Sequence, residues 1–90
     1  MITRSVVIQN CLGIHARPAA LLVQEAGRFQ AMIYLSKGDI KRINAKSIMG
    51  VMMLAAERGA EVTVETDGVD EQEALDALTE VLGRNFEDQI

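Results

Sequence analysis

The stretch Gly13-Ile14-His15-Ala16-Arg17-Pro18-Ala19 is the part of this 90-residue chain around which the rest is organised. It contains the only histidine and the only proline, and a run of helix-forming residues, 19–26, follows it directly. Pro18 suits the first turn of a helix, because an N–H group there has no partner within the helix and can be missing at no cost. We therefore predict that a loop passes into a helix at His15.

The start of such a helix is suited to phosphate. Its free N–H groups and the positive end of the helix dipole form an anion site, to which we assign the backbone N–H groups of Ala16 and Arg17. The guanidinium of Arg17 adds a planar cation that matches phosphate. Imidazole is largely neutral and nucleophilic near pH 7. The pattern therefore indicates that His15 accepts a phosphoryl group.

The composition is that of one small globular domain, residues 1–90, with a polar tail over 83–90. An apolar fraction of 49% argues against disorder, and an aromatic fraction of 3% predicts an aliphatic core. The net charge of -4 argues against nucleic-acid binding, since affinity for a phosphate backbone needs clustered Lys and Arg. The chain has no Gly-x-x-x-x-Gly-Lys loop, so we expect neither ATP binding nor a cofactor.

Cys11 is the only cysteine. One cysteine excludes an internal disulfide and indicates a reducing compartment. One cysteine and one histidine are too few ligands for a zinc site within one chain, so we expect no metal. Cys11 itself is either a small hydrophobic loop residue or a redox sensor. The N-terminus lacks a signal-peptide pattern, and no apolar run is long enough to cross a membrane, so we expect a cytoplasmic protein without membrane insertion.

Hydrophobic periodicity predicts the element order β-α-β-β-α-β-α. Strands are expected over 2–8, 31–36, 40–45 and 60–66, and helices over 16–27, over 48–54 and from Asp70 to Gly83. Strands that alternate apolar and polar residues favour one antiparallel sheet with a single face covered by helices. The fold class is therefore α+β, with two layers.

The same periodicity predicts which residues are buried. Arg4 interrupts the inner face of the first strand. Asp70 is expected to cap the last helix, with Glu73 three residues on, in a start that resembles a capping box. The expected core positions of the helices and later strands are Ala19, Leu22, Val23, Ala26, Ile33, Leu35, Ile43, Ala45, Val62, Val64, Ala74, Leu75, Leu78, Val81 and Leu82.

The middle helix is short and apolar on every side, with Gly50 at its centre. Ser47 is the expected N-cap, because its hydroxyl can accept a hydrogen bond from a free N–H group of the first turn. Val51 and Leu54 are expected to point inward. A short helix in a small domain cannot bury every face. The remaining apolar residues are therefore either additional core or, as we favour, a partner surface rich in adaptable methionine: Ile48, Met49 and Met52.

Three features together resemble the HPr family, the histidine-containing phosphocarriers of the bacterial phosphoenolpyruvate-dependent sugar phosphotransferase system. They are the motif over 13–19, the segment Lys46-Ser47-Ile48-Met49-Gly50-Val51-Met52 and the element order. The likeness extends over 6–82. It implies an open-faced β-sandwich with sheet order 1-4-2-3 and three helices on one face. The oligomeric state stays open, with a monomer as the default expectation.

The resemblance also implies roles for individual residues. His15 would take a phosphoryl group on Nδ1 from phosphorylated enzyme I and pass it to an enzyme IIA domain, with assistance from Arg17. Ser47 would be the serine that an ATP-dependent HPr kinase phosphorylates in many family members. A phosphate there adds about -1.5 to -2 charges, so we expect weaker docking to enzyme I with the fold intact. A transcriptional regulator is a further implied partner.

Two departures accompany the resemblance. The hairpin over 35–44 is about one residue longer than the commonest form. The tail over 85–88 is similar to that of the nitrogen-related carrier NPr, whereas the segment over 46–51 is similar to carbon-type carriers that are regulated through serine. The branch of the family therefore stays open, as does the choice between sugar transport and signalling.

The leading hypothesis is a phosphocarrier rather than an enzyme with turnover of its own. A regulatory binding module that uses phosphorylated Ser47 and makes little use of His15 is the main alternative, and a structural domain with a decayed site is the third. The intact motif over 13–19 argues against both alternatives. Lys46 and Arg28 either steer acidic partners toward the site or are simply solvated surface charges.

Overall fold

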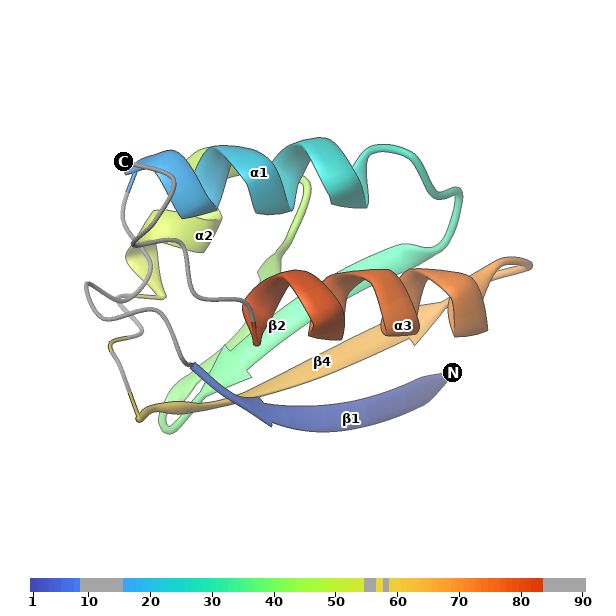
Figure 1. Ribbon diagram of the computed structural model, residues 1–90. Helices are drawn as coiled ribbons and strands as arrows, with labels where there is room; N and C mark the ends of the chain where they lie inside the picture. Colours follow the sequence, from blue (N-terminus) through green and yellow to red (C-terminus); the bar gives the residue numbers. More distant parts are fainter. Residues whose placement is uncertain (9–15, 55–56, 58, 84–90) are drawn as a thin grey trace.

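The computed structural model describes residues 1–8, 16–54, 57 and 59–83. Their elements follow the predicted order (Figure 1). In chain order these are β1 (Ile2–Val7), α1 (Ala16–Ala26), β2 (Met32–Lys37), β3 (Ile40–Asn44), α2 (Ile48–Met53), β4 (Glu61–Asp67) and α3 (Glu71–Leu82). Each element matches a predicted one, and the bounds differ from the predictions by at most one residue at either end.

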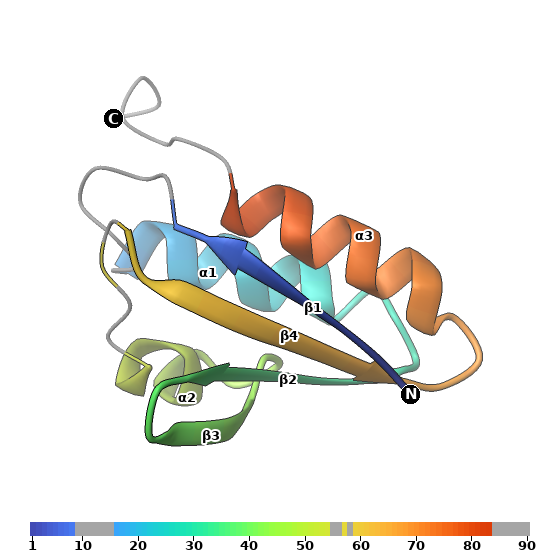
Figure 2. The same ribbon diagram turned by 90° about the horizontal axis from the view of Figure 1, so that it is seen from below.

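The strands form one antiparallel sheet in the order β1-β4-β2-β3, which confirms the expected fold. The helices α1, α2 and α3 all lie on the same face of this sheet, and the other face carries no helix (Figures 1 and 2). The helices therefore form one layer, and their apolar sides pack against the inner face of the sheet. This is the two-layer arrangement expected when strands alternate between a dry face and a wet face.

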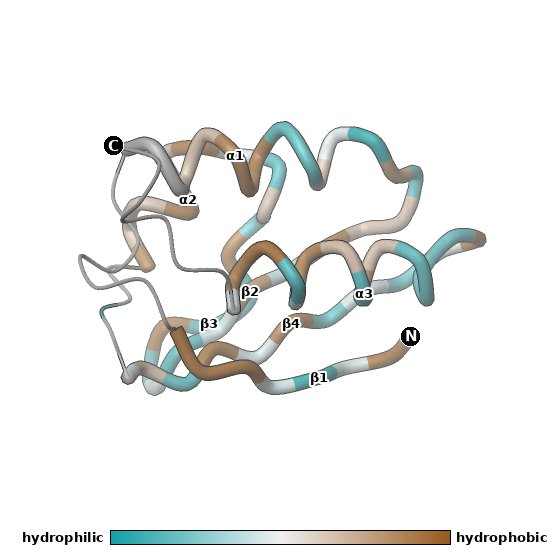
Figure 3. Tube along the Cα trace, in the orientation of Figure 1, coloured by the Kyte–Doolittle hydropathy of each residue, from teal (hydrophilic) through white to brown (hydrophobic). Residues whose placement is uncertain are grey.

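The core fills the space between the two layers, and the buried hydrophobic residues in the described part of the chain are all aliphatic. Hydrophobic and hydrophilic residues alternate along β4 and α3 as the predicted patterns require (Figure 3). Val23 and Ile43 were expected inside and are only partly buried. The buried hydrophobic residues are Ile8, Ala19, Leu22, Ala26, Ala31, Ile33, Leu35, Ala45, Val51, Leu54, Val62, Val64, Ala74, Leu75, Leu78, Val81 and Leu82.

The long hairpin between β2 and β3 accommodates its extra residue as a β-bulge. The pairing shifts between Leu35 and Lys37 of β2, so that Lys41 and Arg42 of β3 lie opposite Ser36 alone. Arg42 has a φ of 54°, in the left-handed region. Its N–H group donates to the Ser36 hydroxyl at 2.9 Å, which gives the displaced backbone group a partner.

The bulge turns Arg42 toward the face of the sheet that carries no helix. Its guanidinium lies 4.3 Å from the centre of the Tyr34 ring, a cation–π distance. It also pairs with the Glu65 carboxylate at 2.9 Å. Tyr34 and Glu65 alternate along β2 and β4 with buried residues, so these contacts form a small polar cluster on the open face.

Two glycines mark places where elements approach too closely for a side chain. A Cβ atom on Gly50 of α2 would lie 2.9 Å from Cγ2 of Ile43 and 3.3 Å from the Asn44 carbonyl oxygen. A Cβ atom on Gly68, which has a φ of 156°, would lie 2.6 Å from Cα of Ala31. Gly50 therefore lets α2 rest on the end of β3, and Gly68 lets the turn before α3 lie against the turn before β2.

Candidate functional site

The helix that the motif was expected to open does begin at Ala16, directly after His15. The structure places the backbone of Ala16, Arg17 and Pro18 in the first turn of α1. This is the position in which backbone N–H groups lack partners within the helix and favour an anion. His15 and Cys11 lie outside the described residues, so the roles assigned to their side chains, and to the side chain of Arg17, stay predictions.

The scaffold that holds this helix start is well packed. Ala19, Leu22 and Ala26 are fully buried along one stripe of α1, as their spacing predicted. The helix contacts both α3 and α2, and α2 lies near the end at which α1 begins (Figures 1 and 2). The start of α1 and the outer face of α2 therefore belong to the same end of the molecule.

Ser47 caps α2 as predicted. Its backbone is extended, with φ -113° and ψ 118°, and its hydroxyl accepts a hydrogen bond from the Gly50 N–H at 3.2 Å. Its carbonyl oxygen accepts the first backbone bond of the helix, from the Val51 N–H at 3.0 Å. The side chain is partly exposed. Helix capping alone is a sufficient structural reason for a serine at this position. The same geometry leaves the hydroxyl at the edge of an exposed surface.

The outer face of α2 exposes a cluster of large apolar side chains. Val51 and Leu54 are buried, as expected, and hold the helix on the core. Ile48, Met49 and Met52 are exposed, and the structure adds Met53, which is 66% exposed. The prediction missed Met53, although it follows Met49 at the helical spacing that brings side chains to the same face. We call these four residues, Ile48, Met49, Met52 and Met53, the α2 patch.

Lys46 and Arg28, considered as charges that might steer partners, both have partners within the chain. The Lys46 ammonium donates to the Phe29 carbonyl oxygen at 2.8 Å, which ties the start of α2 to the turn that follows α1. The Arg28 guanidinium pairs with Glu25 at 2.8 Å and lies 5.7 Å from the centre of the Phe29 ring. Lys46 is therefore a surface charge that also stabilises the packing of the start of α2 against the turn after α1.

The prediction that Asp70 caps its own helix is wrong in its chemistry. Asp70 does occupy the N-cap position of α3, but its side chain makes no capping bond. The carboxylate instead accepts from the backbone N–H groups of Gln30 at 2.9 Å and Ala31 at 2.8 Å. These hydrogen bonds hold the pKa of Asp70 below its usual range, and the bond from Gln30 has the largest effect.

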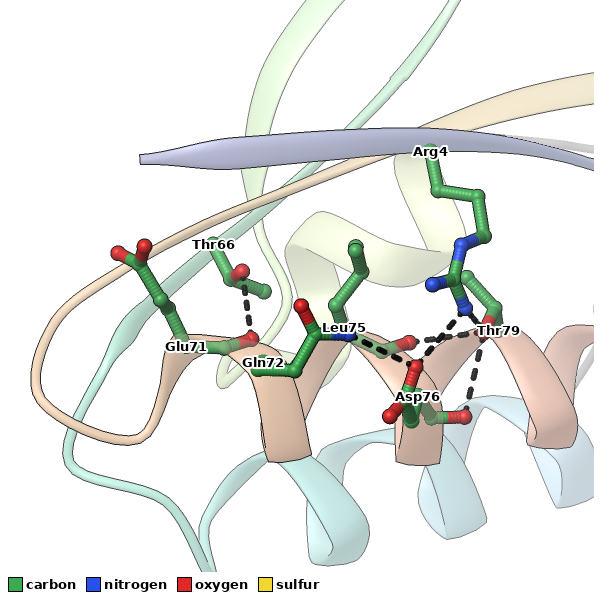
Figure 4. A network of polar contacts seen from close by, with 7 residues as sticks. All are labelled: Arg4, Thr66, Glu71, Gln72, Leu75, Asp76 and Thr79. Carbon is green, nitrogen blue, oxygen red and sulfur yellow. Dashed lines mark hydrogen bonds and ion pairs between the residues drawn. The ribbon is translucent and has the colours of Figure 1, made fainter.

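In place of the capping box expected between Asp70 and Glu73, Glu71 at the first position of α3 contacts the preceding turn. The Glu71 carboxylate accepts from the Gly68 N–H at 3.1 Å, which lowers the pKa of Glu71. The Thr66 hydroxyl, which is fully buried, donates to the Glu71 carbonyl oxygen at 2.9 Å (Figure 4). The start of α3 is thus fixed to β4 and to the preceding turn.

Arg4, the interruption on the inner face of β1, has a specific function in the fold. Its guanidinium donates to Asp76 at 3.0 Å and to the Thr79 hydroxyl at 3.1 Å, both on α3 (Figure 4). Gln72 donates to the same Asp76 oxygen at 3.1 Å. A basic residue can therefore sit on the helix-facing side of β1 because it reaches acceptors at the rim of the helical layer.

Charge is unevenly distributed along the chain. Residues 37–46, which include β3, carry four basic and one acidic side chain, whereas residues 61–82 carry eight acidic and no basic side chains. The part of the sheet that adjoins α2 is therefore basic, and the β4–α3 region is acidic. An acidic partner would be attracted to the first region and repelled by the second.

The parts of the chain that the structure describes contain no group of three or more His, Cys, Asp or Glu side chains that could hold a metal ion. Their helices are all too short or too polar to span a membrane.

Comparisons with known proteins agree with the fold and show the family of the chain. The family model described as PTS HPr component phosphorylation site, where PTS denotes the phosphotransferase system, matches residues 2–84. The phosphocarrier protein HPr of Cupriavidus necator is 51% identical over 86 residues, which are 96% of this chain and 96% of that protein. The chain belongs to the HPr family of phosphocarriers, whose members are carriers rather than catalysts.

Solved structures show the same architecture. The crystal structure of HPr from Bacillus anthracis matches with a TM-score of 0.84 at 48% identity, over 90% of this chain and 95% of that chain. The catabolite repression protein Crh of Bacillus subtilis matches with a TM-score of 0.71 at 49% identity, over 91% of this chain and 93% of that chain. That Crh structure is described as a dimer formed by domain swapping.

Proposed function

We propose that this protein accepts a phosphoryl group from phosphorylated enzyme I on Nδ1 of His15 and passes it to an enzyme IIA domain. The observation that supports the proposal is the start of α1 at Ala16, because His15 directly precedes that residue in the sequence and the first turn of a helix offers free N–H groups. In each transfer the new bond to phosphorus forms as the old one breaks. The imidazole is first the attacking group and then the leaving group.

The site as proposed holds the phosphoryl group loosely. The helix N-terminus supplies about 0.3–1 kcal/mol of favourable field, which stabilises the charge without trapping it. Arg17 supplies a cation that shields the charge as the phosphoryl group moves between donor and acceptor. This balance suits a carrier, because a carrier must release what it accepts.

The α2 patch, which lies at the end of the molecule where α1 begins, is the proposed docking surface. Its residues contribute little to the core, since Val51 and Leu54 already anchor the helix. Apolar side chains that stay exposed at the same end as the start of α1 suit contact with a partner protein. Methionine can adapt its shape, so one patch can serve both enzyme I and enzyme IIA.

Ser47 is the proposed regulatory residue, phosphorylated by an HPr kinase. Its hydroxyl caps α2 at the border of the α2 patch, where a phosphate can be stabilised by the helix start and still repel an acidic partner. We expect Ser47→Asp to reduce the rate of transfer from enzyme I without loss of stability. Transfer at an unchanged rate would refute this regulatory role.

The likeness to Crh favours one second candidate, a module that acts on a transcriptional regulator through phosphorylated Ser47. We propose a monomer acting in the cytoplasm for either function. Gel filtration of the purified chain tests the monomer, because a domain-swapped dimer such as the one described for Crh would elute at about twice the mass.

A relay assay separates the two candidates. The chain is incubated with phosphoenolpyruvate and enzyme I, and an enzyme IIA domain is then added. The carrier proposal expects acid-labile, base-stable phosphate on the chain and its discharge when IIA arrives. A chain that stays unlabelled, while a known HPr is labelled in parallel, refutes the carrier and favours the regulatory module.

A further inference from the structure

The methionines of this protein are distributed in an unusual way. All five, Met1, Met32, Met49, Met52 and Met53, are exposed. The buried hydrophobic residues that the structure describes are all Ala, Ile, Leu and Val. Methionine commonly fills gaps in cores, but here none of the five is a buried core residue, and each has surface that is open to solvent.

Three of these thioethers lie together on one short helix. Met52 and Met53 follow Met49 by three and four positions, and either spacing brings a side chain next to that of Met49 on the helix surface. Met49 is 72% exposed and Met53 66%. The cluster lies directly after Ser47, which caps the helix, and forms most of the α2 patch.

We propose that Met49, Met52 and Met53 form a site of reversible oxidation by peroxides, which switches the α2 patch from apolar to polar. This inference rests on the proposed function of the patch as a docking surface. A lone pair on sulfur attacks one oxygen of hydrogen peroxide, the O–O bond breaks, and the products are methionine sulfoxide and water. Sulfur is oxidised by two electrons and the peroxide is reduced by two. Methionine sulfoxide reductases, which use thiols as the reductant, return the thioether.

Oxidation at this site would change docking and leave the fold in place. The exposed sulfoxides stay hydrated in the free protein, and Val51 and Leu54 continue to hold α2 on the core. When an apolar partner surface covers the patch, each sulfoxide must lose its hydrogen bonds to water or find new ones. At subsaturating concentrations of this protein, we expect the rate of transfer from enzyme I to fall by about tenfold. A loss of this size corresponds to burying one polar group without a hydrogen bond.

The test uses the full chain with the substitution Cys11→Ala, which removes its only thiol. The protein is treated with hydrogen peroxide, sulfoxides are mapped by peptide mass spectrometry, and the rate of phosphoryl transfer from phosphorylated enzyme I is measured. The expected result is oxidation at Met49, Met52 and Met53, an unchanged circular dichroism spectrum, a slower transfer, and recovery of the rate after treatment with sulfoxide reductases.

Two variants make the test specific. The triple variant Met49→Leu, Met52→Leu, Met53→Leu keeps the apolar volume and should transfer at a rate that peroxide does not change. The matched control is Met32→Leu, because Met32 is 48% exposed and Met52 47%. Met32 starts β2, on a different element from the patch. This control should remain sensitive to peroxide.

Either of two results would overturn the inference. One is an unchanged transfer rate after the α2 thioethers are shown to be oxidised, and the other is a triple variant that loses as much rate as the parent. The proposed function fails separately, when the untreated chain accepts no phosphate from enzyme I.

Discussion

Replacing Gly50 with alanine should destabilise this protein, although alanine is a better helix former than glycine. The reason is the close approach of α2 to β3. A Cβ atom at position 50 would lie 2.9 Å from Cγ2 of Ile43 and 3.3 Å from the Asn44 carbonyl oxygen. One of these neighbours is a β-branched side chain, which is stiff at χ1, and the other is backbone. Neither can move aside at low cost.

The expected magnitude follows from two opposing effects. Alanine in place of glycine favours a helix by about 1 kcal/mol. Nonbonded carbon atoms prefer about 3.5–4.0 Å, so a contact of 2.9 Å is short by roughly 0.6 Å or more. Inserting a methyl group into such a site costs about 1–3 kcal/mol. We expect the free energy of unfolding to fall by about 1 kcal/mol.

A double-mutant cycle with Ile43→Ala provides the decisive assay. Removing Cγ2 of Ile43 relieves the shorter contact, so Gly50→Ala should be neutral or stabilising in that background. Urea unfolding of the four proteins should give a coupling of about 1 kcal/mol or more between the two sites. If Gly50→Ala stabilises the parent by its full helix propensity, or if the two substitutions are additive, the proposed contact between α2 and β3 is wrong.

Three further predictions concern the turns and caps that position the site. Gly68→Ala should destabilise by about 2 kcal/mol or more in urea unfolding, since its Cβ would lie 2.6 Å from Cα of Ala31; wild-type stability would contradict this contact. Asp70→Asn should lower stability at neutral pH. The pKa of Asp70 in the folded state is lowered, chiefly by the Gln30 N–H. The carboxylate therefore adds to the free energy of unfolding above the pKa of an ordinary aspartate, and this stabilisation is lost as pH falls through the lower pKa of the folded state. A gap between wild type and variant that stays undiminished as pH falls far below the ordinary carboxyl pKa would refute this. Ser47→Ala should cost about 1 kcal/mol in thermal unfolding, and Ser47→Asp, which retains an acceptor, should not; equal stability of Ser47→Ala and wild type would reject the cap.

The layers of the fold could be predicted from the sequence because periodicity reports on burial. Val62 and Val64 alternate with polar residues, and both are buried. Ala19, Leu22 and Ala26 follow the spacing of one helical face, and they are buried too. A pattern of this kind depends only on the geometry of one element, so it is visible without knowledge of its neighbours.

The errors and surprises come from contacts between residues far apart in the chain. Asp70 has the local signature of a helix cap, yet its carboxylate binds the backbone of Gln30 and Ala31, about forty positions earlier. Arg4 interrupts an apolar face in the sequence pattern, and only the tertiary structure shows its acceptor, Asp76. Local chemistry lists what a side chain can do, and the tertiary structure decides which option is used.

The candidate site was predictable to different degrees. Ser47 and the start of α1 were found from capping rules and from Pro18, because both signals are local. Met53 was missed, because a six-residue helix that is apolar on every side gives no clear division between inner and outer faces. The one local signal for Met53 is its spacing of four positions from Met49, which relates the two side chains on the helix surface.

The central claim is that Nδ1 of His15 carries the phosphoryl group, and one measurement tests it most directly. The chain is labelled with ¹⁵N-histidine, its only histidine being His15, and is phosphorylated by enzyme I and phosphoenolpyruvate. Long-range ¹H–¹⁵N spectra then report on each ring nitrogen. The proposal predicts that the Nδ1 resonance shifts, that Nε2 remains the protonated nitrogen, and that His15→Ala takes up no phosphate. Phosphate bound to the chain with both ring nitrogens unchanged, or uptake that survives in His15→Ala, would contradict it.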